Sequence, residues 1–265
     1  MDVDAYLRRI DYHGPRQCAP VTLQDLHRKH LFTVPFENLD IPLKVPISLD
    51  LDLIYEKVVG RNRGGFCYEL NGLFCKLLKA LGFRVQMLSA RVRRDDGGFG
   101  PEFDHMLLKV DLEDPWLVDV GFGDSFVDPI LFRSGGADQV NGHRYLVLPA
   151  DDDWLLVRED EKGQSPLYRF RDEPRQLDDY REMCHFHQTA PESGFTQRWI
   201  CSRATPDGRI TMANRRLIIT RNSGREESVL TTDAEVRAGL SENFGIAFPA
   251  TVDLARLGSE EKIKA

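Results

Sequence analysis

The stretch Arg61-Asn62-Arg63-Gly64-Gly65-Phe66-Cys67-Tyr68-Glu69-Leu70-Asn71-Gly72 decides how this chain is interpreted. Apolar residues recur at helical spacing from residue 70 to residue 81, which predicts a helix with Cys67 at or near its start. Backbone N–H groups are unpaired at a helix N-terminus and the dipole is positive there, so a thiolate is favoured. The two glycines permit a positive φ and let a substrate approach the backbone closely. Cys67 is therefore a candidate nucleophile, with a buried packing cysteine as the alternative.

Two segments downstream supply a candidate base and acid, which a thiolate nucleophile usually requires. Residues 103–110 and 116–120 are typical of strands, and Leu112-Glu113-Asp114-Pro115 between them is typical of a turn. If the hairpin folds near Leu112, His105 and Asp119 lie roughly opposite each other, with Cβ atoms about 5 Å apart. A register slip of one residue would separate them across the sheet. Taken singly, each residue has an alternative: His105 could be a core histidine, and Asp119 a turn or edge carboxylate.

Three sequence blocks surround these residues: Val34-Pro35-Phe36-Glu37-Asn38-Leu39, then residues 63–69, then His105 followed by Val118-Asp119-Val120-Gly121-Phe122-Gly123. In order and approximate spacing they resemble the arylamine N-acetyltransferase family. Weaker resemblance at Ser193-Gly194-Phe195 and at residues 243–246 extends the match over nearly the whole chain. The resemblance implies that Cys67 accepts the acyl group, that His105 is its base, and that Asp119 orients His105.

The resemblance also implies a cleft in which acetyl-coenzyme A and the acceptor amine meet. The residues that it assigns to this cleft are Phe36, Phe122, Gly123, Asp124 and Phe195. The aromatic residues among them could instead belong to the core. The same resemblance implies that Glu37 and Arg63 form a buried ion pair that holds the nucleophile loop, since a partly buried charge needs a partner. Two unrelated surface charges are the alternative.

The composition is that of an ordinary globular protein. The chain has 265 residues, of which 42% are hydrophobic and 29% charged, enough for a large core in one to three compact units. The formal net charge of −7 argues against nonspecific nucleic-acid binding as the main activity. No apolar run is long enough to span a membrane, and the acidic segment of residues 1–7 lacks a signal-peptide core. Five widely spaced cysteines without a C-x-x-C motif predict a reducing cytoplasm rather than a disulfide framework.

The period of the hydrophobic pattern changes along the chain. It is helical in the first third, alternates from Arg84 onward in a way that suggests a barrel or curled sheet, and is mixed in the last third. Thr22-Leu23-Gln24-Asp25 and Thr232-Asp233-Ala234-Glu235 have capping-box form and predict helix starts. Residues 134–138 are expected to form a loop, and residues 260–264 a frayed tail.

The resemblance implies an α+β multidomain fold with a cysteine-protease-like catalytic core. In that arrangement residues 1–83 form an N-terminal helical bundle that carries the nucleophile. Residues 84–182 form a central β-barrel that carries the histidine and the aspartate, and residues 183–265 form a C-terminal α/β lid. Catalysis would then occur at a domain boundary, which is a usual location for a pocket.

A metal site is not expected. Cys184-His185-Phe186-His187 could suggest zinc, because alternate positions of a strand share a face. No second ligand pair stands elsewhere at a recognisable spacing, so a four-ligand site is not visible in the sequence.

These features predict a cytoplasmic acyltransferase that works by double displacement. The Cys67 thiolate would take the acetyl group from acetyl-CoA as a thioester, and an arylamine, arylhydrazine or arylhydroxylamine would then accept it. His105 would move the protons, and backbone N–H groups near Cys67 would bind the oxyanion. The alternatives are a transglutaminase-like cysteine hydrolase with the same triad, an amide synthase of secondary metabolism, and a silent binding protein. The expected partners are the small-molecule amine and coenzyme A, with no nucleic acid or membrane; the sequence predicts no oligomeric state.

Overall fold

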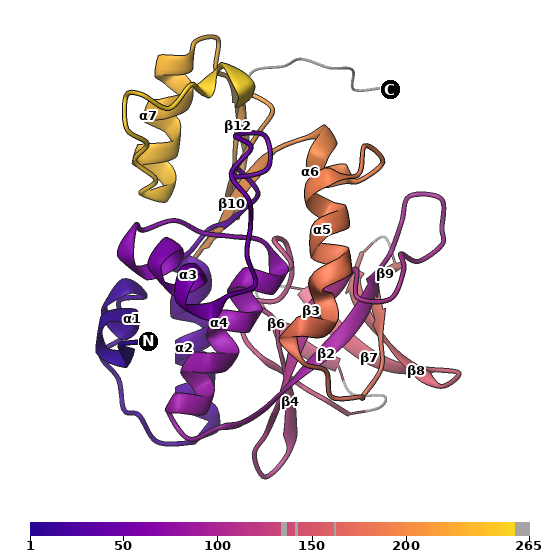
Figure 1. Cartoon of the computed structure of the whole chain (residues 1–265). Helices are drawn as coiled ribbons and strands as arrows, with labels where there is room; N and C mark the ends of the chain where they lie inside the picture. The colour runs from indigo at the N-terminus through magenta and orange to yellow at the C-terminus, as the bar shows by residue number, and fades with distance from the viewer. Residues whose placement is uncertain (134–136, 141–142, 162, 258–265) are drawn as a thin grey trace.

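A computed structural model of the chain describes residues 1–133, 137–140, 143–161 and 163–257. It confirms an α+β fold: helices gather beside a large antiparallel sheet, and a smaller sheet with its own helix lies beyond them (Figure 1). Of the expected loop at residues 134–138, residues 134–136 lie outside the described residues, and the prediction is wrong for residues 137 and 138, which begin the strand Ala137–Val140. The expected tail at residues 260–264 lies entirely outside the described residues. Within the described part of the chain, no helix has the length and apolar character needed to cross a membrane.

The first third of the chain is helical, as predicted. Its elements are α1 (Val3–Arg9), α2 (Pro20–Thr33), the two-residue strand β1 (Phe36–Glu37), α3 (Leu51–Tyr55), the π-helical turn η1 (Glu56–Gly60) and α4 (Cys67–Ala80). Helix α4 is buried along most of its length and ends at Ala80; Gly82 follows the C-cap residue Leu81, and its φ of +93° suits glycine. The predicted start of α2 at Thr22 is wrong, because Pro20 occupies the first turn and begins the helix earlier.

An eight-stranded antiparallel sheet follows, with the strand order β5-β4-β3-β2-β9-β8-β7-β6. Its strands are β2 (Arg84–Val92), β3 (His105–Asp111), β4 (Pro115–Val118), β5 (Ile130–Leu131), β6 (Ala137–Val140), β7 (His143–Ala150), β8 (Asp153–Asp160) and β9 (Gly163–Phe170). Leu88, Leu117, Tyr145 and Leu156 come from separate strands of this sheet but belong to one buried apolar cluster. The sheet is therefore curled around a shared core.

The β3–β4 hairpin has a different register from the one predicted. Leu108 pairs with Val118, and Asp111 pairs with Pro115, so the turn holds only residues 112–114. Continued past the end of β4, this register puts residue 121 opposite His105, two positions beyond Asp119. Asp119 is thus diagonal to His105 rather than directly opposite it. An offset of two residues keeps both side chains on the same face, which explains how they still meet.

The last third contains helices and a second antiparallel sheet. Its elements are η2 (Leu177–Tyr180), α5 (Arg181–Thr189), α6 (Gly194–Gln197), β10 (Ile200–Thr205), β11 (Gly208–Ala213), β12 (Arg216–Arg221), β13 (Gly224–Val229), α7 (Asp233–Phe244) and η3 (Leu254–Leu257). Helix α7 begins at the predicted capping box: Thr232 Oγ1 accepts from the Glu235 N–H, and the Glu235 carboxylate accepts from the Thr232 N–H. The segment from Cys184 to His187 lies in helix α5, so the strand-like spacing considered for a metal site is wrong.

The smaller sheet has the order β1-β10-β11-β12-β13, so its first strand comes from the helical third of the chain. Phe36 pairs with Ser202, and Glu37 pairs with Cys201. Phe36 also forms a parallel bridge with Gly65, two residues before Cys67. The loop that leads to the candidate nucleophile is therefore attached to the last third of the chain.

Candidate active site

Cys67 is the first residue of helix α4, as predicted. The preceding residue, Phe66, is extended with φ −96° and ψ −172°, and its N–H donates to the Glu69 carboxylate at 3.1 Å. The first N–H groups of a helix have no intrahelical acceptor, so this end can bind a developing negative charge. The Cys67 side chain is nearly buried, with 3% of its residue surface exposed.

Next to this helix start, His105 and Asp119 form a hydrogen-bonded pair. His105 Nε2 lies 2.7 Å from Asp119 Oδ2, and both residues are buried. The other carboxylate oxygen, Oδ1, accepts from Asn71 Nδ2 at 2.9 Å and from the Gly121 N–H at 3.0 Å. Burial acts to raise the pKa of Asp119, but these three partners outweigh it and hold the pKa below its ordinary value. The carboxylate is thus ionised and fully engaged, and Nδ1 is the His105 nitrogen left for proton exchange.

The pKa of the Cys67 thiol differs from the sequence prediction. Burial raises this pKa well above its ordinary value, and the carboxylates of Asp119 and Asp104 act in the same direction. A hydrogen bond with the Met106 backbone opposes them but does not prevail. Burial and the neighbouring carboxylates thus shift the pKa in the direction opposite to the lowering predicted from the helix N-terminus. A thiol in this state needs a base at the moment of attack, which makes the neighbouring imidazole more important.

Gly121 explains how the loop after β4 can lie directly on the first turn of α4. A Cβ atom at this position would stand 2.8 Å from the Cys67 Cα and 2.7 Å from Asn71 Nδ2. Real side chains essentially never approach that closely, so only glycine allows this contact. This close contact places Asp119 and its neighbours beside the helix that contains Cys67.

Cys67 and His105 line one cleft of about 440 Å³, which we call the active-site cleft. The five cleft residues assigned from the sequence all line it: Phe36, Phe122, Gly123, Asp124 and Phe195. The Phe122 ring lies edge-on to His105 with centroids 5.2 Å apart, and Phe36 lies 6.1 Å from Phe195. Asp119 lies behind His105, outside the lining. The cleft thus combines a thiol and an imidazole with aromatic walls.

Sequence reasoning missed several residues that build this site. Asn71 is the clearest: its Nδ2 also donates to the Met106 carbonyl at 2.7 Å, and its Oδ1 accepts from the Val120 N–H at 3.0 Å. It therefore joins helix α4, strand β3 and the Asp119 loop. Its position four residues after Cys67, on the same helix face, was the available signal. His187, Arg198 and Arg209 also line the cleft. The sequence pointed to His187 only as part of a possible zinc motif, and no motif pointed to the two arginines.

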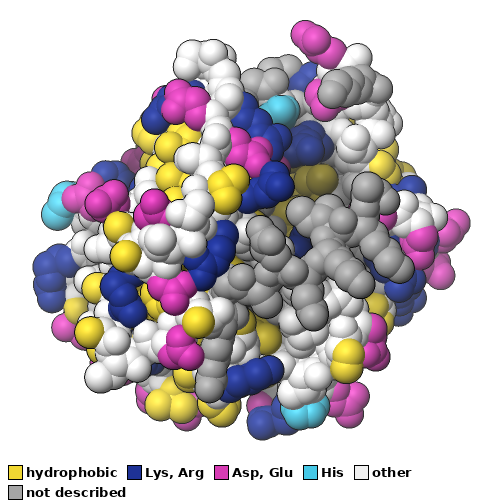
Figure 2. Space-filling view, turned by 90° about the horizontal axis from the view of Figure 1, so that it is seen from above, with side chains coloured by type: hydrophobic (Ala, Val, Ile, Leu, Met, Phe, Trp, Pro, Cys, Tyr) yellow, Lys and Arg dark blue, Asp and Glu magenta, His cyan; other side chains and the backbone are white. Residues whose placement is uncertain are grey.

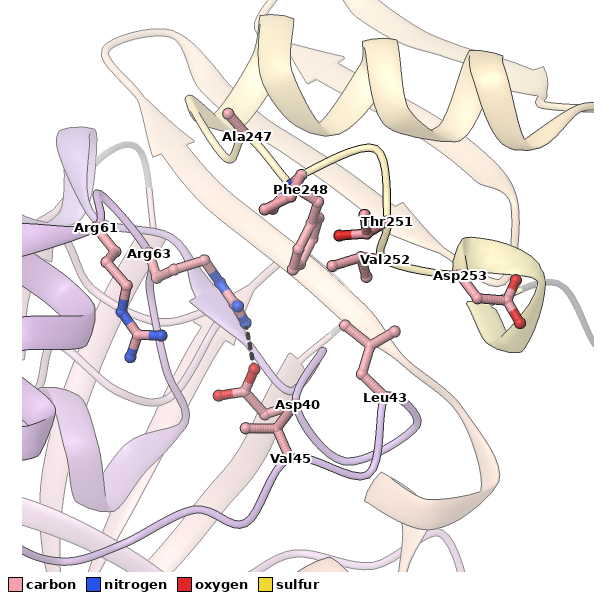
Figure 3. A pocket seen from close by; sticks show the side chains of 11 residues that line it. Asp40, Leu43, Val45, Arg61, Arg63, Ala247, Phe248, Thr251, Val252 and Asp253 are labelled. Atoms are coloured by element: carbon pink, nitrogen blue, oxygen red, sulfur yellow. Dashed lines mark hydrogen bonds and ion pairs between the residues drawn. The ribbon is translucent and has the colours of Figure 1, made fainter.

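The ion pair expected between Glu37 and Arg63 is present, with Arg63 Nε 2.9 Å from Glu37 Oε1. It belongs to a larger buried cluster in which Arg63 also binds Asp40 at 2.8 Å (Figure 3). Lys57 binds Asp40 at 2.7 Å and Glu69 at 2.8 Å. Three carboxylates share two cations, and burial raises the pKa of Glu69 to about 7 against the effect of Lys57. Through Glu69, this charge cluster reaches the backbone of Phe66, directly before Cys67.

A second cavity, of about 530 Å³, lies beside the charge cluster and is shown in Figure 3. Arg63 and Asp40 form part of its wall, and the Arg63 guanidinium lies 4.8 Å from the centre of the Phe248 ring. Among the described residues, it shares no lining residue with the active-site cleft. Its lining includes neither Cys67 nor His105, so it is not the candidate active site.

A third cavity, of about 650 Å³, adjoins the active-site cleft, because Asp124 and Arg209 line both. We call it the outer chamber. Arg158 and Arg221 also line it, and Arg209 donates to Asp124 at 3.1 Å and to the Gly123 carbonyl. From above, Lys and Arg side chains gather beside a hollow in the surface in which hydrophobic atoms are visible (Figure 2). The lining of the outer chamber holds three arginines against two carboxylates, Asp124 and Asp207, and this excess of positive charge suits a negatively charged group.

No group of three or more histidine, cysteine or acidic side chains able to hold a metal ion occurs among the residues that the structure describes. All five cysteines are free.

Comparisons with known proteins agree on one family. A family model described as N-acetyltransferase matches residues 21–252. The arylamine N-acetyltransferase of Mycolicibacterium smegmatis is 34% identical over 254 residues, which cover 93% of this chain and 92% of that protein. The Escherichia coli (strain K12) arylamine N-acetyltransferase is 35% identical, over 91% of this chain and 87% of that protein.

Solved structures give the same result. The arylamine N-acetyltransferase of M. tuberculosis superposes with a TM-score of 0.87 at 33% identity, covering 98% of this chain and 97% of that one. The Mycobacterium marinum arylamine N-acetyltransferase in complex with CoA superposes with a TM-score of 0.89 at 32% identity, covering 97% of each chain. With the match extending over nearly the full length in sequence and in structure, the chain belongs to the arylamine N-acetyltransferase family.

Proposed function

We propose that this protein moves an acetyl group from acetyl-CoA to an arylamine, arylhydrazine or arylhydroxylamine, through a thioester on Cys67. The observation that carries the proposal is the arrangement of three residues. Cys67 and His105 line one cleft, and the buried Asp119 carboxylate binds His105 at 2.7 Å. This is the combination of nucleophile, base and orienting acid that acyl transfer requires.

In the first half-reaction, His105 Nδ1 takes the Cys67 proton while the sulfur attacks the thioester carbonyl of acetyl-CoA. The tetrahedral oxyanion is stabilised by N–H groups at the start of α4. It collapses when the carbonyl re-forms and the bond to the coenzyme A sulfur breaks, and the imidazolium returns its proton to that sulfur. In the second half-reaction, the amine attacks the carbonyl carbon of the Cys67 thioester and gives its proton to His105 Nδ1. The carbon–sulfur bond to Cys67 then breaks, and the imidazolium returns the proton to the sulfur, which releases the acetylated amine and regenerates the thiol.

The coenzyme A part of the acyl donor would bind in the outer chamber. Arg158, Arg209 and Arg221 would face the phosphates of coenzyme A, to which guanidinium groups bind strongly. Arg158 Nε and Ser125 Oγ, which belong to residues of this lining, are buried and have no hydrogen-bond partner among the described residues. The thioester would reach Cys67 past Asp124 and Arg209, where the chamber and the cleft meet. The CoA complex of the Mycobacterium marinum relative supports this donor.

We further propose that the chain has three parts: a helical bundle at residues 1–83, a β-barrel at residues 84–182 and an α/β lid at residues 183–265. In support, α4 supplies Cys67, the curled sheet supplies His105, and residues 194–211 add another wall of the cleft. A nucleophile on a helix start facing a histidine on a sheet is the layout of a cysteine-protease-like core. The free cysteines are consistent with a reducing compartment, and the cytoplasm is the proposed location.

Intact-mass analysis tests the proposal. Wild-type protein mixed with acetyl-CoA should gain one acetyl group and lose it when an arylamine is added. Cys67→Ser should gain none, because this site cannot ionise a serine hydroxyl. Cys75→Ser provides the matched control, since Cys75 is a buried cysteine of the same helix.

Three results would contradict or redirect the proposal. An acetyl group on Cys67→Ser would show that the nucleophile is a different residue. Loss of the acetyl group to water at the same rate with and without amine would favour the cysteine hydrolase. Initial-rate lines that intersect rather than run parallel, with no trapped adduct, would exclude the covalent route.

A further inference from the structure

His27 joins the two ends of the loop that carries the candidate acid. Its Nε2 accepts a hydrogen bond from the Asp119 backbone N–H at 3.2 Å. Its Nδ1 lies 2.8 Å from the Val127 carbonyl oxygen, which can only accept. Both bonds form together only in the neutral imidazole whose proton is on Nδ1. One side chain of helix α2 therefore ties residue 119 to residue 127.

The loop of residues 119–127 holds much of the site. It starts with Asp119, continues through Gly121 against Cys67, and includes the cleft wall Phe122. A change in its path would move these groups together, and small misplacements at a reacting centre are costly in rate.

The surroundings of His27 keep the ring fixed and uncharged. The ring is fully buried and stacks on Phe126 with centroids 5.8 Å apart and an angle of 13°. The Phe74 ring lies edge-on to it at 6.3 Å. Burial lowers the pKa of His27, in agreement with the neutral form that the two hydrogen bonds require.

We propose that His27 is a positioning residue of the acyl transfer reaction: its ring, oriented by the Nδ1–H bond to Val127, accepts from the Asp119 N–H at the start of the loop and thereby places Asp119 against His105 and Gly121 against Cys67. It does not line the active-site cleft and touches no reacting atom. The inference rests on the proposed function for its role in turnover, while the hydrogen-bond arrangement itself can be tested without any substrate.

Three substitutions separate the two hydrogen bonds. In His27→Gln the amide oxygen can occupy the place of Nε2 and accept from Asp119, whereas in His27→Asn the amide nitrogen can replace Nδ1 and donate to Val127. His27→Phe keeps a ring but removes both bonds. We expect His27→Gln, which keeps the bond to Asp119, to acetylate within about 3-fold of the wild-type rate. His27→Asn and His27→Phe lose that bond and leave the buried Asp119 N–H without its acceptor, so they should be slower by roughly 10- to 100-fold.

The rate of Cys67 alkylation by iodoacetamide, measured against pH, supplies a readout that a purely structural role would not change. His27→Asn and His27→Phe should shift the midpoint of this profile, because a misplaced Asp119 no longer stabilises the His105 imidazolium that forms as the thiol ionises. His30→Phe is the matched control. His30 is a buried histidine of the same helix that also contacts Phe74, but its hydrogen bond goes to Tyr6. It should lower stability without moving the midpoint.

Nitrogen-15 NMR of the wild-type protein at pH 7 tests the arrangement even if the variants do not fold. The spectrum should show His27 as the neutral Nδ1–H tautomer. An Nε2–H tautomer or an imidazolium would overturn the proposal, as would equal acetylation rates and unchanged alkylation profiles in His27→Gln and His27→Asn. Wild-type protein that forms no acetyl-enzyme would instead overturn the proposed function, and the tautomer and alkylation results would still stand.

Discussion

The two oxygens of the Asp119 carboxylate have different partners, and this difference decides what an amide would do there. Oδ1 accepts from Asn71 and Gly121, while Oδ2 accepts from His105. In Asp119→Asn the amide oxygen would stay with the two donors, and the amide nitrogen would face His105 Nε2. The amide nitrogen can only donate, so His105 Nε2 would have to accept and the imidazole proton would move to Nδ1. A protonated Nδ1 cannot take the proton of Cys67. We expect kcat to fall by about 10³- to 10⁴-fold, measured by initial rates with acetyl-CoA and an arylamine.

Asp153→Asn is the control for loss of a buried carboxylate. Asp153 is 4% exposed and binds Arg169 and Arg171 away from the cleft, so this variant should lose stability but keep its kcat. If Asp119→Asn turns over as fast as Asp153→Asn, Asp119 does not orient the base.

The charge cluster predicts a dependence of stability on pH that is centred on one side chain. Burial raises the pKa of Glu69 to about 7, above the ordinary value near 4.5, so between these pH values the folded state binds more protons than the unfolded state. The free energy of unfolding should therefore decrease as pH rises from about 4.5 to 7. In Glu69→Gln this component should disappear, as measured by urea unfolding across that range.

Glu235→Gln provides the comparison, because hydrogen bonds with Thr232 and Thr231 lower the pKa of this exposed carboxylate. Its contribution is complete above its ordinary pKa and is lost only at lower pH, so the wild-type slope between pH 4.5 and 7 should remain. The same slope in Glu69→Gln as in the wild type would show that Glu69 is ionised throughout.

At this scale, the sequence predicted the three residues that the structure brings together at the cleft, but not their electrostatics. Cys67 could be found because its surroundings in the chain, a double glycine and a helical apolar pattern, are local. The direction of its pKa shift depends on burial and on Asp104 and Asp119, which tertiary structure brings to it. Asn71 was visible in the sequence, but its role required knowledge of the carboxylate that it binds.

The contact between the Asp119 loop and helix α4 depends on the absence of a side chain at Gly121. Its backbone has no positive φ, so space alone is the constraint. In Gly121→Ala the loop must move away from Cys67 and Asn71. We expect a loss of about 1–3 kcal/mol in the free energy of unfolding and a marked decrease in the acetylation rate. Urea unfolding and stopped-flow acetylation measure the two effects.

Gly72→Ala is a matched substitution within α4. The nearest atom to its added Cβ would be a flexible Leu177 methyl at 3.3 Å, and alanine favours a helix interior. Its stability should stay within about 1 kcal/mol of the wild type. A Gly121→Ala variant that behaves like Gly72→Ala would mean that the loop can move without affecting the site.

Among the elements, long periodic segments were predictable and local boundaries were less so. The apolar repeat placed α4 correctly at both ends. The hairpin register was wrong because the strand signal does not show whether Pro115 belongs to the turn or to β4. Helix α5 was not predicted, because its sequence contains few of the apolar repeats that mark a helix.

At the scale of the whole molecule, the two-residue strand β1 links parts of the chain that lie far apart in sequence. Asn38, next to β1, exchanges hydrogen bonds with Ile200 and donates to the carbonyls of Phe195 and Arg198. No periodic pattern can identify so short a strand, so the sequence could not show which sheet it joins. The predicted order of helices, curled sheet and mixed region was nevertheless visible, because each part has its own period.

This linkage predicts the behaviour of a divided chain. Residues 1–191 contain Cys67, His105 and Asp119, but they lack β10 and one wall of the cleft. Produced alone, this fragment should form no acetyl-enzyme in intact-mass analysis. Co-expression with residues 192–265 should restore the adduct, since the break lies in the exposed segment of Pro191 and Glu192. Acetylation of the first fragment alone would show that β1 needs no partner strand.

Because β1 pairs with β10, the two strands of this pair are synthesised at different times. A ribosome releases the helices, Cys67 and the His105 hairpin well before it translates residues 200–205. During that interval β1 has no β10 with which to pair. An unpaired strand next to an incomplete apolar core is open to association with other chains. Slow codons between residues 120 and 200 would lengthen that interval, and we expect them to lower the yield of active enzyme more than slow codons placed after residue 230.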